Sequence, residues 1–118
     1  MSDASGETPL RDLLLTMTAD SLEASGLDPR TLMLVRIGAL VAVDAPPASY
    51  LLNLGVAADA GVDGAQVRDV MAAVAPIVGT ARIASAVSNV VTALGVAELT
   101  AELAELEEEL EEEEEENA

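Results

Sequence analysis

Cysteine and histidine are absent from the 118 residues, as are phenylalanine and tryptophan, and there is one tyrosine. Without cysteine the chain has neither a disulfide nor a thiolate, which excludes peroxidase and disulfide reductase activity. All five basic residues are arginine, so a serine nucleophile would find only carboxylates to act as its base. We therefore predict no catalytic residue, no metal site and no cofactor. Whether the protein is an enzyme stays undecided, with these absences favouring a protein that is not.

Basic residues are scarce, and the negative charge is uneven. Residues 1–97 hold ten acids and five arginines, a net charge of −5, whereas residues 98–118 hold twelve glutamates and no base, a net charge of −12. This balance argues against nucleic acid and anionic membranes as partners, because both are bound through Lys or Arg patches. The acidic end could instead meet a basic protein partner. The first residues show no basic stretch followed by an apolar one, so we predict no signal peptide and a cytoplasmic location.

Apolar residues are plentiful, at 51% of the chain. The stretch LMLVRIGALVAV at residues 32–43 carries one charge, Arg36, and its apolar residues surround the helical wheel. It is too short to span a bilayer and is typical of a central, buried helix. With so few aromatics, Ala, Val and Leu must fill the core. Such a core buries little area per residue, which favours an oligomer.

Helix signals follow one another along the chain, and no strand pattern appears. Asp28 and Pro29 begin the central helix, while Asp63 and Gln66 have the spacing of a capping box. We predict an all-α bundle of about six helices, divided into a disordered N-terminus (1–8), a helical domain (9–96) and an acidic segment (97–118). Helices are expected from Thr8-Pro9 to Gly26, from Asp28-Pro29 to Val43, over 48–60, over 64–75 ending at Pro76, over 81–94 ending at Gly95, and over 96–116.

The last segment has a leucine seam (Val96, Leu99, Leu103, Leu106 and Leu110) with the three-and-four spacing of a coiled coil. Two interpretations remain open. The segment could dock on its own domain as an amphipathic helix that ends in a solvated tail, or it could join subunits. In a seam between identical chains, glutamate would face glutamate with no lysine to answer. The six glutamates at 111–116 repel one another, and we expect them to be disordered.

A series of marks in residues 28–95 resembles the carboxymuconolactone decarboxylase family, which includes the alkylhydroperoxidase D-type proteins. The marks are DPRT at 28–31, a proline break, AGV at 60–62, VMAAVAP at 70–76, and Gly79 with a helix running to Gly95. The resemblance implies an all-helical bundle that assembles into trimers or hexamers.

The resemblance also implies where the redox members carry their reactive groups. Counting back from Ala60, the two cysteines of their Cys-x-x-Cys motif fall at Pro46 and Ser49, and the histidine falls at Asn53. A glutamate of the central helix falls near Met33. All four are replaced in this chain, so the thiol relay cannot operate, and a lactone decarboxylase reaction that uses the histidine becomes doubtful too.

Four polar residues near that place are candidates for binding a ligand: Arg36, Ser49, Tyr50 and Asn53. A buried guanidinium must be paired, and we expect Arg36 to pair with an acid such as Asp44 or Asp59, or with another subunit. The alternative is that its planar fork anchors a carboxylate ligand. Ser49 and Asn53 share a helix face at positions i and i+4, where they either line a pocket or lie on an ordinary surface.

Three functions fit these observations. The protein could be a non-redox, oligomeric structural or binding member of the family with an exposed acidic C-terminus. It could instead act on, or bind, a small carboxylated compound in the retained family pocket. Finally, it could be an interaction protein that docks through its acidic tail.

Overall fold

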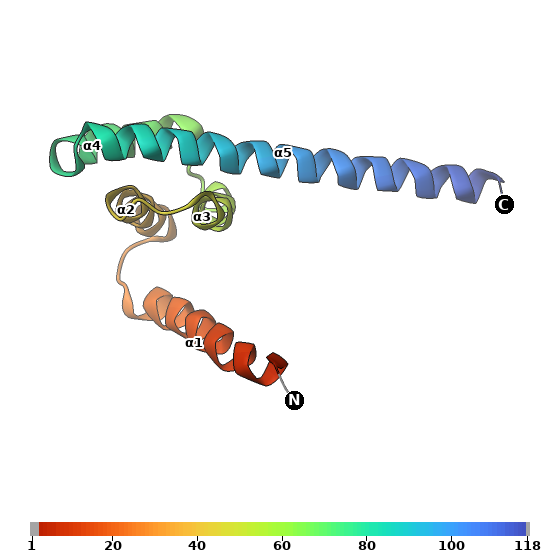
Figure 1. The fold of residues 1–118 in the computed structure, drawn as a ribbon, viewed down its shortest axis with the longest axis horizontal. Coiled ribbons are helices and arrows are strands. Elements are labelled where there is room, and N and C mark those ends of the chain that lie inside the picture. The colour runs from red at the N-terminus through yellow and green to blue at the C-terminus, as the bar shows by residue number, and fades with distance from the viewer. Residues whose placement is uncertain (1–2, 118) are drawn as a thin grey trace.

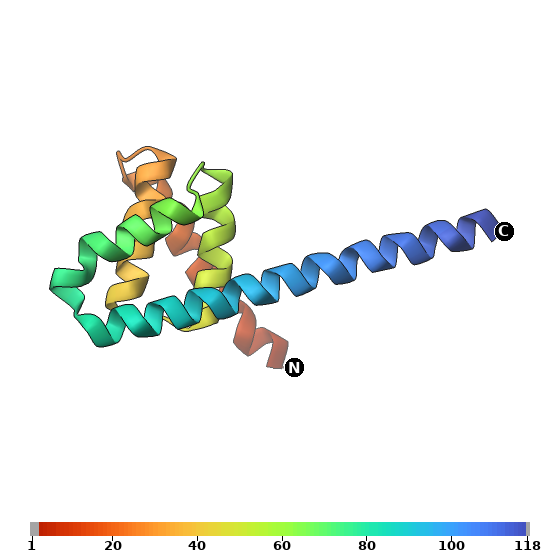
Figure 2. The ribbon, with the colours of Figure 1, turned by 90° about the horizontal axis from the view of Figure 1, so that it is seen from above.

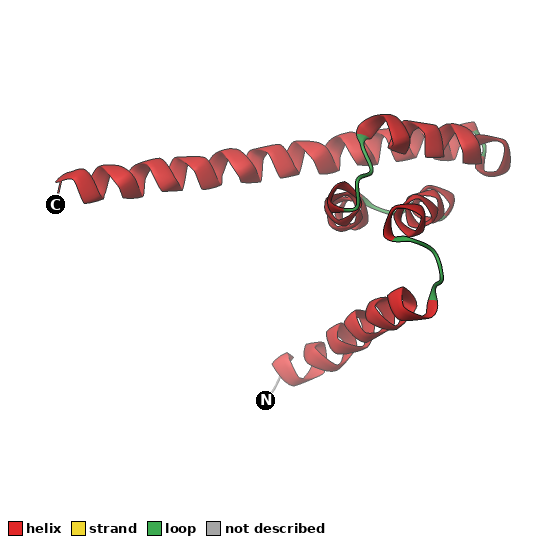
Figure 3. Cartoon of the chain, turned by 180° about the vertical axis from the view of Figure 1, so that it is seen from behind, coloured by secondary structure: helices red, strands yellow, loops and turns green. Residues whose placement is uncertain are grey.

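The computed structural model describes the backbone of residues 3–117 and the side chains of residues 8–117. Within these residues there are helices and no strands (Figures 1 and 3), so the all-α prediction is confirmed. There are five helices rather than about six, because the two expected after Gly79 form one. They are α1 (Asp3–Ala24), α2 (Pro29–Ala42), α3 (Pro47–Asp59), α4 (Gly64–Val78) and α5 (Thr80–Asn117).

Four of the helices pack in two crossed layers. Figure 1 shows α2 and α3 nearly end-on beneath α4 and α5, which run across the view, and Figure 2 shows the same crossing from above. Helix α2 packs against α3, α4 and α5, and α5 also packs against α3 and α4. The central position of α2 agrees with its charge-poor sequence.

Local capping signals were correctly predicted. The Asp28 carboxylate accepts a hydrogen bond from the Thr31 backbone N–H at 2.9 Å and so caps α2. At the start of α4, Asp63 Oδ1 accepts from the Gln66 N–H at 2.9 Å, and Gln66 Oε1 accepts from the Asp63 N–H at 3.0 Å. This is the predicted capping box.

Three helices continue through a proline or a glycine, residues that usually end a helix. The predicted helix boundaries were wrong at these three places. Helix α1 begins at Asp3 and passes through Pro9, so the expected disorder of residues 1–8 does not hold from Asp3 onward, and residues 1–2 lie outside the described part. Helix α4 passes Pro76 and ends two residues later at Val78, and its C-cap residue Gly79 has a φ of 88°. Helix α5 passes Gly95, which costs only about 1 kcal/mol within a helix and has no proline after it.

The core lies between α2 and the helices around it. Its largest fully buried side chains are Tyr50, Met33, Ile37 and Val41. Gly38 is also buried, and a Cβ at that position would lie 3.4 Å from Val74 on α4, which is close to ordinary van der Waals contact. The rest of the core consists mainly of Val and Ala, as the composition requires.

Two parts of the chain project from this core. Helix α1 packs against none of the other described helices, and its large apolar side chains are at least half exposed. Every residue from 94 to 117 of α5 is exposed as well, and Figure 2 shows this half of α5 (the arm) extending past the bundle. The radius of gyration is 18.1 Å. A compact domain of this length would have about 13 Å.

The arm excludes one of the two open interpretations and corrects one expectation. Its leucine seam does not dock on its own domain, and residues 111–116 are helical rather than disordered. A helix that is already formed extends easily through glutamate, which is a good helix former, and this opposes the repulsion between the charges. Among the described residues, α5 alone has a window long and apolar enough to cross a membrane. Core helices of soluble proteins pass the same test, and the apolar half of α5 packs on α3.

Candidate functional site

The turn between α2 and α3 has an unusual backbone. Asp44 has a φ of 55°, and it alone among the described non-glycine residues has a positive φ. The Asp44 N–H donates to the Val41 carbonyl at 3.2 Å, and the Ala45 N–H donates to the Leu40 carbonyl at 3.0 Å. This is a Schellman motif, in which the left-handed position is usually glycine. Asp44 therefore occupies a position that its own backbone disfavours.

The end of α3 shows the usual solution to the same problem. Gly61 takes the left-handed position with a φ of 90°, and its N–H donates to the Ala58 carbonyl at 3.0 Å. The Val62 N–H completes the motif by donating to the Ala57 carbonyl at 2.9 Å. The two turns have the same geometry, so the aspartate at 44 needs an explanation other than the turn itself.

The Asp44 side chain supplies that explanation. Its Oδ1 accepts a hydrogen bond from the Ser85 hydroxyl of α5 at 2.6 Å, a short bond of the charge-assisted kind. Asn89, one helical turn further along α5, donates from Nδ2 to the Ala45 carbonyl at 3.0 Å. Together these bonds fasten the α2–α3 turn to α5. The sequence analysis missed this cluster, although the i, i+4 spacing of Ser85 and Asn89 was a signal that they share a face.

Tyr50 lies next to this cluster in α3 and is fully buried. Its hydroxyl has no hydrogen-bond partner among the described residues. Burial raises the pKa of Tyr50 above 10.0, and the negative charge of Asp44 raises this pKa further. The tyrosine is therefore neutral at ordinary pH, and its ring fills the core while its hydroxyl contributes an unmet polar group.

The structure does not connect the four candidate ligand residues into one site. Arg36 is half-buried and donates from Nη2 to the Ser21 hydroxyl of α1 at 3.0 Å. No carboxylate of the described side chains lies within ion-pair distance of Arg36, so the predicted pairing with Asp44 or Asp59 was wrong. The reason is that Arg36 lies at the side of α2 nearest α1 and reaches water, so its charge needs no buried partner.

Ser49 and Asn53 do share a face of α3, as predicted, but they interact with each other. Asn53 donates from Nδ2 to the Ser49 carbonyl at 2.9 Å, which occupies its amide nitrogen within the helix. Among the described residues, no hydrogen bond joins Arg36 to Ser49, Tyr50 or Asn53. Their role in binding a ligand stays a prediction.

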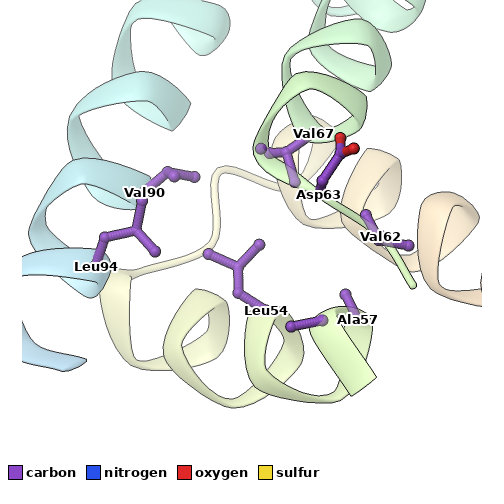
Figure 4. A pocket seen from close by; sticks show the side chains of 9 residues that line it. Leu54, Ala57, Val62, Asp63, Val67, Val90 and Leu94 are labelled. Carbon is purple, nitrogen blue, oxygen red and sulfur yellow. The ribbon is translucent and has the colours of Figure 1, made fainter. Parts of the chain in front are cut away.

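A small apolar cavity of about 230 Å³ lies beside α3, between the start of α4 and the middle of α5 (Figure 4). Asp63 is the one charged residue that lines it, and its carboxylate already caps α4. The cavity is thus mainly apolar, and its one carboxylate already accepts a hydrogen bond from the backbone through Oδ1. Its lining residues are Leu54, Ala57, Ala58, Val62, Asp63, Gly64, Val67, Val90 and Leu94.

Comparison with known families identifies the family of this chain. The model of the carboxymuconolactone decarboxylase family matches residues 9–98, more than half of the chain. The chain belongs to the carboxymuconolactone decarboxylase family. Comparison with curated proteins and with solved structures gave no match. The match ends at residue 98, near the start of the arm, so most of the arm lies outside the matched region.

The positions that resemble the redox motif of this family can now be located. Pro46 is the N-cap residue of α3, and Ser49 lies in the first turn of that helix. Met33, near the glutamate position, is buried in the core. The corresponding places therefore hold no thiol, no imidazole and no carboxylate. The neighbouring Asp44 serves to hold the turn.

Proposed function

We propose that this protein is a non-redox member of the carboxymuconolactone decarboxylase family that works as a homo-oligomeric structural or binding module, with its acidic C-terminus exposed. The observation that carries the proposal is the uncovered apolar face of α1. Leu10, Leu13, Leu14 and Met17 recur at helical spacing on that face, and each is at least half exposed.

The surface area of the chain supports the same conclusion. The accessible surface is 8275 Å² for a mass of 12.1 kDa. A folded monomer of that mass exposes roughly 6000 Å², so the chain exposes an excess of roughly 2300 Å². A standard protein interface buries about 800 Å² per partner, which this excess can supply more than once.

The charges beside the α1 face suit a second copy of the same chain. Arg11 lies along one edge of the face and Asp20 along the other, as the rotation of 100° per residue places them. The face is therefore not flanked by charge of one sign alone, so repulsion between like charges does not by itself oppose pairing of two copies. The family resemblance suggests a trimer or a hexamer as the form of the assembly.

Measuring mass in solution tests the proposal. Sedimentation equilibrium of the full chain across a range of concentrations should give a multiple of 12.1 kDa. The double variant Leu13→Glu/Leu14→Glu places two charges on the apolar face and should shift the mass to that of the monomer. The control, Thr16→Glu/Ala19→Glu, adds the same charge outside that face and should keep the assembly.

Three results would contradict the proposal. The first is a monomeric full chain at every concentration, and the second is a Leu13→Glu/Leu14→Glu variant that keeps the mass of the unaltered protein. The third concerns chemistry: peroxide reduction by the purified chain would refute the non-redox part.

A further inference from the structure

The leucine seam of the arm has no cover within its own chain. Val96, Leu99, Leu103, Leu106 and Leu110 are each between 46% and 57% exposed. Because every residue from 94 to 117 is exposed, the family domain leaves the whole seam open to solvent. Figure 2 shows the arm extending well past the other helices.

The seam is also not an extension of the stripe that seats α5 in the core. The buried residues of α5 are Ala86, Val90 and Ala93, and helical spacing continues that stripe as Ala97, Ala101 and Ala104. The leucines follow a different face. The chain therefore carries large apolar residues on a face of the arm that cannot reach its own core.

The charges that flank the seam select the kind of partner. With Val96 and Leu103 as first core positions of successive heptads, the flanking positions include Glu102, Glu107 and Glu109. Glu114 and Glu116 extend the same two flanks. Pairing with a second arm would place glutamate against glutamate on both sides, which is destabilising.

No other segment of this chain can neutralise those flanks. Its five basic residues are Arg11, Arg30, Arg36, Arg68 and Arg82, and no two of them have the spacing of flanking positions on a helix carrying an apolar seam. The flanks of the seam carry negative charge alone, whereas both signs of charge lie beside the α1 face. The occupant must bring its own positive charges.

We propose that residues 96–110 of α5 dock a basic amphipathic helix of a different protein, in which Leu or Ile occupies the core heptad positions and Lys or Arg occupies both flanks. The apolar seam provides the contact area, and the flanking glutamates make the contact specific for a positively charged partner. This inference does not rest on the oligomer proposed above, because a different helix and a different charge pattern carry it.

The test uses the full chain and two designed peptides of three heptads, both with leucine at the core positions. One peptide has lysine at every flanking position, and the other has glutamate there. Titration calorimetry at low salt should show binding of the lysine peptide and none of the glutamate peptide. Raising the ionic strength should weaken the binding, because exposed charges are screened.

Matched charge variants of the arm separate a register-specific coiled coil from general attraction to polyanions. Glu102→Lys/Glu107→Lys/Glu109→Lys reverses the flanks and should lower affinity for the lysine peptide by about tenfold or more, while creating affinity for the glutamate peptide. Glu98→Lys/Glu105→Lys/Glu108→Lys makes the same charge change on outer positions. It should alter the affinity by less than about threefold.

Several results would overturn this inference. Equal loss of affinity in the two triple variants would show general polyanion attraction rather than a docking seam. Binding of the glutamate peptide by the unaltered protein would favour a second copy as the occupant. Sedimentation of the protein with vesicles of neutral lipid, abolished by Leu103→Asp/Leu106→Asp, would make the seam a membrane contact.

Discussion

Helix α2 and the arm of α5 are both rich in apolar residues, yet one lies at the centre of the molecule and the other extends from it. In α2 the apolar residues surround the helix, and Ile37 and Val41 are completely buried. In the arm they form a single stripe between glutamates, and each of them is about half exposed. The difference teaches that apolar spacing specifies a contact, whereas the charges around it decide whether that contact lies inside the chain or with another molecule.

Helix α1 lies between these two extremes. Like the arm, it has an uncovered apolar face, but charges of both signs flank that face. Its one described bond to the core is the hydrogen bond from Arg36 to Ser21. A copy of the same chain is the partner that we propose for α1, and a basic protein is the partner that we propose for the arm.

The largest difference in stability should appear when one apolar side chain of the core and one of the arm are each truncated to alanine. Ile37→Ala leaves a cavity in a fully buried site and should lower the free energy of unfolding by about 2–4 kcal/mol. Leu106→Ala in the arm should change it by less than about 0.5 kcal/mol, because that side chain packs against nothing in its own chain. Urea unfolding at one fixed protein concentration measures both. A similar loss in the two variants would mean that the arm is packed.

A smaller effect is expected where the α2–α3 turn meets α5. Ser85→Ala removes the donor to Asp44 and should lower the free energy of unfolding by about 1 kcal/mol. Asp44→Gly removes the same hydrogen bond, but glycine adopts the left-handed backbone conformation without the steric cost that aspartate has. In the Ser85→Ala variant the hydrogen bond is already lost. There Asp44→Gly removes only the steric cost and should raise the free energy of unfolding by about 1 kcal/mol.

A double-mutant cycle of urea-unfolding measurements on these two residues gives the coupling directly. A coupling of zero would show that the bond between the Ser85 hydroxyl and the Asp44 carboxylate does not hold the turn. The positive φ of Asp44 would then need another cause.

The smallest effect concerns Tyr50. Because its buried hydroxyl lacks a partner in the described structure, Tyr50→Phe should raise the free energy of unfolding at neutral pH by up to about 1 kcal/mol. The pKa of Tyr50 is raised in the folded protein, so the unfolded state loses this proton first as pH increases. Stability should therefore fall as pH rises above 10.0, until the folded protein ionises too.

Absorbance at alkaline pH can follow this ionisation, because Tyr50 is the single tyrosine of the chain. The tyrosinate signal should appear at higher pH in the folded protein than in urea. The Tyr50→Phe variant should lack the alkaline loss of stability that this residue causes. Identical titrations in the folded and unfolded states would contradict the burial of Tyr50.

Features set by neighbouring residues could be predicted from sequence. Asp28, Asp63 and Gln66 cap helices through bonds that span three residues, and the composition around them identifies the ends of α2 and α4. The order of marks along the chain was also enough to identify the family. These signals act locally, so no knowledge of the fold is needed to interpret them.

The predictions from sequence were wrong where the preference of a single residue was outweighed by interactions with distant parts of the chain. Pro9 and Pro76 each disfavour a helix by about 3 kcal/mol and Gly95 by about 1 kcal/mol, yet helices formed on both sides pass through them. The bonds to Ser85 and Asn89 connect residues 41 and 44 positions apart, which no spacing rule anticipates. Arg36 was expected inside the core because its neighbours are apolar, but helix geometry carries it to the side of α1.

Helix α5 continues through Gly95 without a break, and this gives the molecule a lever. The 24 residues from 94 to 117 form a rod of about 36 Å whose inner end is seated by Ala86, Val90 and Ala93. A tilt of about 5° at that seat would move the tip by about 3 Å over such a length. Force applied to the far end is thus delivered to the small alanine contacts with α3, and the seating of α5 sets the direction in which the acidic tip points.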